Sequence, residues 1–95
     1  MTNVHIRHKI ENYDKWKSAF DAFVEERKAG GERSYQIFRP TDDPDNLILK
    51  FEWSDEESAK SFLASDSLKQ AMQDAGVVEA PEVHITSLAD QGQTA

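Results

Sequence analysis

Three histidines, His5, His8 and His84, are the side chains in this 95-residue chain best suited to move protons near neutral pH. His5 and His8 are three residues apart in a run that alternates like a β-strand, so they point to opposite faces and cannot share a metal ion. His5 and His84 agree in phase if the first and last strands are neighbours. No carboxylate ligand accompanies that pair, so we predict polar lining groups and no metal site.

His8 is the ionisable residue in phase with the apolar side chains of its strand. Two interpretations stay open. In the structural one, a core imidazole is hydrogen-bonded to a backbone carbonyl or to a hydroxyl such as that of Tyr13. In the functional one, His8 is a catalytic acid or base in a cleft between sheet and helices. Burial would then lower its pKa and keep it neutral, which suits a base.

The aromatic residues Tyr13, Trp16 and Trp53 would shape a pocket around His8 and bind a planar substrate. By spacing, both tryptophans are core residues, although an indole N–H at a cleft edge can orient a ligand. The carboxylates of residues 42–45 lack the glycine and the downstream glutamate of a calcium loop, so we interpret them as turn formers. The sequence has no glycine-rich phosphate loop, no nucleophile elbow and no cysteine.

Four strands and two helical segments must position these residues. A period of two predicts strands over 4–10, 33–39, 47–53 and from Pro81 to about 86, and the phase of 33–39 is ambiguous because neither face is cleanly apolar. An apolar stripe predicts one helix from an Asn12 cap to Gly30-Gly31. A capping box at 54–57 starts a second helical segment, which breaks at 65–67 and ends at Gly76.

The order strand, helix, strand, strand, broken helix, strand predicts a ferredoxin-like α+β domain, a four-stranded antiparallel sheet with both helical segments on one face. The helices should cover the face that carries Val4, Ile6, Ile10, Leu47, Leu49, Phe51, Trp53, Val83 and Ile85. We predict a single domain over residues 1–89 and a flexible tail over 90–95, which lacks apolar residues apart from alanine.

Composition limits the partners. Eighteen acidic against 11 basic residues give a net charge of −7, which disfavours nucleic acid and anionic membrane surfaces. No apolar run is long enough to span a bilayer, and no signal segment is recognisable, so a cytoplasmic location is expected.

The stretches RHKIENYDKWKSAF, YQIFRPTDDPDNLILKFEW and ESAKSFLASDSLKQAMQDAGVVEAPEV resemble the small dimeric α+β-barrel proteins related to antibiotic biosynthesis monooxygenases, some of them called cyclases. The resemblance covers residues 4–88. It implies a homodimer in which two sheets face each other, so that Ile48, Leu88 and Tyr35 would leave water.

The resemblance also implies a function: cofactor-independent monooxygenase or cyclase-like chemistry on a small aromatic or polyketide-like compound, with His8 as the acid or base. Haem-degrading relatives use a helical histidine, and no histidine here falls on a predicted helix. The alternatives are a non-catalytic small-molecule-binding or stress-associated homodimer, and a purely structural dimer without a pocket, since fold alone does not define function.

Overall fold

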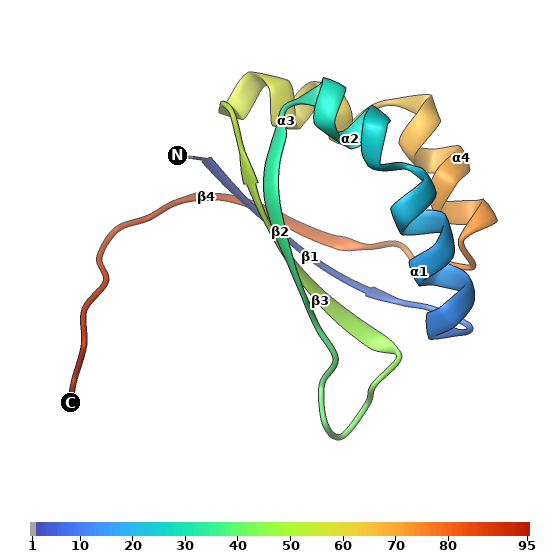
Figure 1. Cartoon of the computed structure of the whole chain (residues 1–95), viewed down its shortest axis with the longest axis horizontal. Helices are drawn as coiled ribbons and strands as arrows, with labels where there is room; N and C mark the ends of the chain where they lie inside the picture. The colour runs from blue at the N-terminus through green and yellow to red at the C-terminus, as the bar shows by residue number, and fades with distance from the viewer. Residues whose placement is uncertain (1) are drawn as a thin grey trace.

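The computed structural model describes residues 2–95, and it has the predicted ferredoxin-like α+β architecture. Each helical segment is a pair of short helices. The elements are β1 (Thr2–Lys9), α1 (Tyr13–Ala22), α2 (Val24–Gly30), β2 (Glu32–Phe38), β3 (Asn46–Trp53), α3 (Glu56–Leu63), α4 (Asp66–Asp74) and β4 (Glu82–Ser87). Figure 1 shows all four helices on one side of the sheet.

The sheet has the strand order β2-β3-β1-β4, and every neighbouring pair is antiparallel. Because β1 and β3 are central, the residues they carry are enclosed by strands on both sides. His8 of β1 lies opposite Leu47 of β3, and His5 lies opposite His84 of β4. This confirms that the first and last strands are adjacent in the sheet. The pairing of His5 with His84 depends on that adjacency.

The core occupies the helix-covered face, as the alternation of apolar residues predicts. Its strand residues are buried to 5% exposure or less: Val4, Leu47, Leu49, Phe51 and Trp53. Trp16, Phe20 and Ala59 meet them from the helices. Val83 is less covered than expected, at 37% exposure. It lies on β4, an edge strand.

The sequence predicted one helix from the Asn12 cap to Gly30-Gly31, and the structure has two helices there. The prediction of a continuous helix was therefore wrong. Phe23 interrupts it, with φ −91° and ψ 8°. Its backbone N–H is shared between the carbonyls of Ala19 and Phe20 at 3.1 and 3.3 Å. The Arg27 side chain also donates to the Phe20 carbonyl. That carbonyl would accept from Val24 in a continuous helix, so Arg27 stabilises the break.

The phase of β2, ambiguous in the sequence, is set by its register with β3. Tyr35 lies opposite Phe51 and Ile37 opposite Leu49, so both belong to the helix-covered face. The expectation that Tyr35 lies on the open face is therefore wrong. Its ring meets Phe20 edge-on at 5.0 Å. Phe38, opposite Ile48, takes its place on the open face.

The helix ends follow the predicted residues closely. Asn12 caps α1 by accepting from the Lys15 N–H at 2.9 Å. At α3 the cap is Asp55, one residue later than the predicted capping box places it, because its carboxylate accepts from the Ser58 N–H at 2.7 Å. Residues 88–95 follow β4 without a helix or strand and run away from the sheet (Figure 1). Their flexibility stays a prediction.

Candidate functional site

His8 lies between the sheet and α1, where it is 6% exposed. Its ring meets the Trp16 indole edge-on, with centroids 5.8 Å apart. β1 places His8 on the helix-covered face because Val4 and Ile6 alternate with it toward the same side. An imidazole is thus held in an aromatic environment inside the domain.

Both ring nitrogens of His8 are buried, and neither has a hydrogen-bond partner within residues 2–95. The interpretation of a core histidine satisfied by a carbonyl or by the Tyr13 hydroxyl is therefore wrong. Burial disfavours the charged imidazolium and lowers the pKa of His8 from 6.5 to about 4. The ring is neutral at pH 7, with one nitrogen free to accept a proton and the other free to donate a hydrogen bond.

The space between the sheet and the helices contains a cavity of about 330 Å³. This volume is near the lower end of the range typical of small-molecule pockets, roughly 300–1,000 Å³. Its walls are mostly apolar and aromatic. Among the lining residues are His8, Trp16, Phe20, Arg27, Glu32 and Trp53. A small planar molecule fits these surroundings better than a strongly hydrated one.

Three of the four predicted site residues line one cavity, but Trp53 lies beside Thr2, at the opposite end of β1 from His8. His8, Trp16 and Trp53 line the cavity, and Tyr13 is not part of its lining. The Tyr13 ring packs against Trp16 at 6.0 Å, and the Arg39 guanidinium lies 4.4 Å from its centroid. The Trp53 N–H donates to the Gly30 carbonyl at 2.9 Å. Because that donor is engaged, Trp53 offers a ligand its ring rather than its N–H.

Sequence reasoning missed two charged residues of the cavity wall, Arg27 and Glu32. Arg27 Nε lies 2.8 Å from Glu32 Oε1, and their side chains are 5% and 7% exposed. Burial raises the pKa of Glu32 and outweighs the opposing effect of the Arg27 charge. The available signal was the phase of Arg27 in the apolar stripe, seven residues after Phe20.

The remaining ionisable candidates lie away from the cavity. His5 is hydrogen-bonded to Thr86 at 3.0 Å on the open face, and His84 pairs with Glu82 at 3.1 Å. Within residues 2–95, no group of three or more histidine or acidic side chains is arranged to hold a metal ion.

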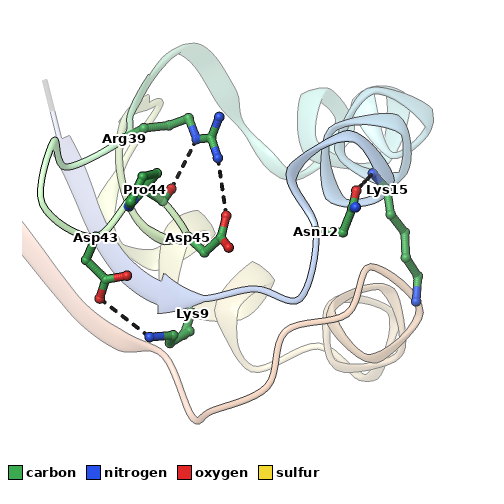
Figure 2. Close-up of polar contacts among 7 residues, drawn as sticks. All are labelled: Lys9, Asn12, Lys15, Arg39, Asp43, Pro44 and Asp45. Atoms are coloured by element: carbon green, nitrogen blue, oxygen red, sulfur yellow. Dashed lines mark hydrogen bonds and ion pairs between the residues drawn. The ribbon is translucent and has the colours of Figure 1, made fainter.

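The acidic turn between β2 and β3 is tied down by basic side chains, as Figure 2 shows. Arg39 donates to the Pro44 carbonyl at 3.1 Å and reaches Asp45 at 3.2 Å. Lys9 lies 3.5 Å from Asp43. The turn-forming interpretation of these carboxylates fits this arrangement, because Asp45 pairs with Arg39 within the loop and Asp43 joins the loop to β1 through Lys9.

The architecture and the cavity define this chain as a ferredoxin-like α+β protein with a largely apolar internal pocket. The model of the antibiotic biosynthesis monooxygenase family matches residues 1–74. The chain therefore belongs to the antibiotic biosynthesis monooxygenase family, as its resemblance to that group predicts. No curated protein matches it in sequence. No helix within residues 2–95 is long and apolar enough to cross a membrane.

Solved structures agree with this assignment at the level of the fold. One is an antibiotic biosynthesis monooxygenase with 17% identity and a TM-score of 0.70, covering 95% of this chain and 100% of that chain. A conserved protein from Methanosarcina mazei Go1 has 19% identity and a TM-score of 0.68, with 90% and 89% covered. A mutant of SnoaB, a cofactor-independent oxygenase from Streptomyces nogalater, has 14% identity and a TM-score of 0.70, with 95% and 93% covered.

Proposed function

We propose that this chain is a cofactor-independent oxygenase of a small, electron-rich aromatic compound, which it binds in the cavity between sheet and helices. The observation that carries the proposal is His8, a buried neutral imidazole with two unpaired nitrogens at the wall of an aromatic cavity. An unpaired buried polar group costs free energy, about 1–3 kcal/mol. A ligand that supplies the missing partner removes this cost. Membership of the family supports the same class of reaction.

In the proposed reaction, His8 accepts a proton from a phenol or from the methylene group of its keto tautomer. Because burial makes His8 a weak base, the nearby substrate anion must stabilise the imidazolium that forms. The anion transfers electrons to dioxygen and forms a C–O bond, and the resulting peroxide takes back the proton held by His8 to give a hydroperoxide. Loss of the remaining C–H proton and cleavage of the O–O bond then leave a carbonyl and release water. The substrate supplies all four electrons, so no further reductant is required.

Oxygen consumption with a panel of hydroxylated naphthalenes and anthrones tests the proposal. His8→Gln and His8→Ala should each lower the turnover of an accepted compound at least about 100-fold, because general-base catalysis contributes about that much. Circular dichroism should show the fold retained. His84→Gln, on the open face, is the matched control and should leave the rate unchanged.

Two results would count against this function. Wild-type turnover in the His8 variants would remove His8 from the mechanism. Tight binding of the panel compounds without any oxygen consumption would instead favour the alternative stated in the sequence analysis, a small-molecule-binding protein without catalysis.

We propose further that the open face of the sheet pairs with a second copy of the chain. This face carries exposed apolar side chains among its charged ones: Phe38 at 48% exposure, Ile48 at 41%, and Leu88, which follows β4, at 63%. A partner sheet would remove the strand residues among them from water. The charged neighbours Arg7 and Glu82 are already paired at 2.8 Å, which limits the cost of covering them.

The cytoplasmic location expected from the sequence stays a prediction.

A further inference from the structure

A row of rings along the helical wall of the cavity connects its two polar regions. The His8 ring lies 5.8 Å from Trp16, and Trp16 stacks on Phe20 at 4.8 Å. The Arg27 guanidinium lies 3.6 Å from the centroid of the Phe20 ring. All four residues line the cavity. The cavity wall therefore has an imidazole at one end of this row and a guanidinium at the other.

The two polar regions belong to opposite ends of the sheet. His8 lies opposite Leu47, at the beginning of β3, and Glu32 lies opposite Trp53, at its end. Six residues of strand separate these two levels, roughly 20 Å at about 3.3 Å per residue. Arg27 and Glu32 are thus too far along the sheet to act on the atom that His8 deprotonates. Their role toward a ligand is recognition.

The Arg27–Glu32 pair keeps hydrogen-bonding capacity after its internal contacts are made. A guanidinium has five N–H groups. Arg27 uses one for Glu32 Oε1 and one for the Phe20 carbonyl. The second oxygen of Glu32 takes part in no hydrogen bond within residues 2–95. The pair therefore presents N–H donors beside a carboxylate acceptor, with no net charge.

We propose that Arg27 and Glu32 form a second polar subsite of the cavity, which binds a neutral group with a carbonyl and an adjacent O–H or N–H at the far edge of a planar aromatic ligand. Arg27 donates to the carbonyl, and Glu32 accepts from the hydroxyl or amide. An aromatic carboxamide has the required pair of groups. A carboxylate does not, because Glu32 already compensates the Arg27 charge and would repel it. This inference rests on the proposed function only in taking the cavity as the ligand site.

The pair also has a structural position, since it joins the end of α2 to the start of β2 across Gly31. A structural role alone makes no distinction between ligands. Replacing a buried ion pair with apolar residues of similar volume is often neutral or stabilising. The double variant Arg27→Met with Glu32→Leu therefore separates the two roles, because the fold should survive while ligand discrimination is lost.

The probes are naphthalene-2-carboxamide, 2-methylnaphthalene and 2-naphthoate, and binding is followed by the fluorescence of Trp16 and Trp53 at pH 7. In the wild type, the carboxamide should bind about tenfold or more tighter than the methyl compound, since each added hydrogen bond to a charged group contributes about 1.5 kcal/mol or more. It should also bind tighter than the naphthoate. In the double variant, the dissociation constants of the carboxamide and the methyl compound should differ less than about threefold.

A single substitution gives a second, independent result. Glu32→Gln keeps the shape of the side chain but leaves the Arg27 charge uncompensated. The preference should reverse, so that the naphthoate binds about tenfold tighter than the carboxamide. The control is the exposed ion pair Lys17–Asp21 of α1, at 2.6 Å. Asp21→Asn should leave all three affinities unchanged.

Each outcome decides something different. If the methyl compound binds the wild type as tightly as the carboxamide, or if the carboxamide preference survives the double substitution, the second subsite is overturned and the cavity remains a ligand site. If the naphthoate binds the wild type most tightly, the assignment to a neutral group is overturned. If none of the probes binds, the second subsite is overturned, and oxygen consumption with the hydroxylated compounds decides the proposed function separately.

Discussion

The two faces of the sheet are made by the same strands, yet they place histidine side chains in opposite environments. On the helix-covered face, burial leaves His8 neutral and without a partner, and lowers its pKa to about 4. On the open face, His5 and His84 are directly opposite each other and have polar partners in Thr86 and Glu82. The comparison shows that surroundings rather than residue type select His8 as the candidate base.

The largest expected effect compares adjacent residues of β3 that point to opposite faces. Leu49 is 2% exposed and Ile48 is 41% exposed. Leu49→Ala should lower the free energy of unfolding by about 2–5 kcal/mol, because it leaves a cavity in the core. Ile48→Ala should cost under about 1 kcal/mol. Urea unfolding of both variants at a concentration where the chain is monomeric checks this, and equal losses would contradict the assignment of faces.

The pH dependence of stability reports the burial of His8. Since the folded-state pKa of His8 lies below its unfolded value of 6.5, the unfolded chain takes up the proton first as the pH falls. The contribution of His8 is complete above about pH 6.5 and is lost between there and about pH 4, a change of about 3 kcal/mol. In His8→Leu this loss should disappear.

The test of His8 burial is the free energy of unfolding of the wild type and of His8→Leu, measured at several pH values from 7 to 4. Ile48→Ala, which removes no titratable group, serves as the control and should keep the pH profile of the wild type. A His8→Leu profile parallel to that of the wild type would show that His8 is not held neutral by the fold.

The proposed use of the open face as a dimer interface predicts a smaller effect. Ile48→Asp should raise the dissociation constant of the dimer at least about tenfold, because it places an unpaired charge in the interface. Sedimentation velocity measures this. Ser61→Asp adds the same charge at an exposed position of α3 and should leave the mass unchanged. A monomeric wild type at micromolar concentration would refute the interface.

The smallest expected effect on stability concerns the N-terminal end of α1, in the layer of helices that covers one face of the sheet. Asn12→Ala removes the N-cap of α1, shown in Figure 2, and should cost about 1 kcal/mol in the free energy of unfolding. Lys15→Ala removes an exposed pair with Glu11 at 3.2 Å and should cost under about 0.5 kcal/mol. A larger loss for Lys15 than for Asn12 would show that the cap does not hold α1.

Much of the fold was predictable because local pattern and tertiary structure agree. In β3, apolar and polar residues alternate strictly from Leu47 to Trp53, so the sequence indicates which face is buried. In β2 no such alternation exists, and only its register with β3 decides that Tyr35 faces the helices. Register depends on a partner strand, so a pattern within β2 could not supply it.

The site was predictable in part for the same reason. His8 stands out as a polar residue in an apolar phase, which a single strand reveals. Its unpaired nitrogens and the pairing of Arg27 with Glu32 depend on which side chains meet in three dimensions. A charged residue in an apolar stripe usually extends its head group to solvent. Only the geometry of the α2–β2 connection shows that Arg27 does not.

The break at Phe23 has a consequence for how this chain could change over evolutionary time. A loop usually absorbs insertions, but the single residue between α1 and α2 fixes the rotation of α2 about its axis. One residue added or deleted there would turn α2 by about 100° relative to α1. Arg27 would leave the cavity and the half-exposed Val24 would change its environment. Relatives that differ in length at this position should therefore have lost the Arg27–Glu32 pair together.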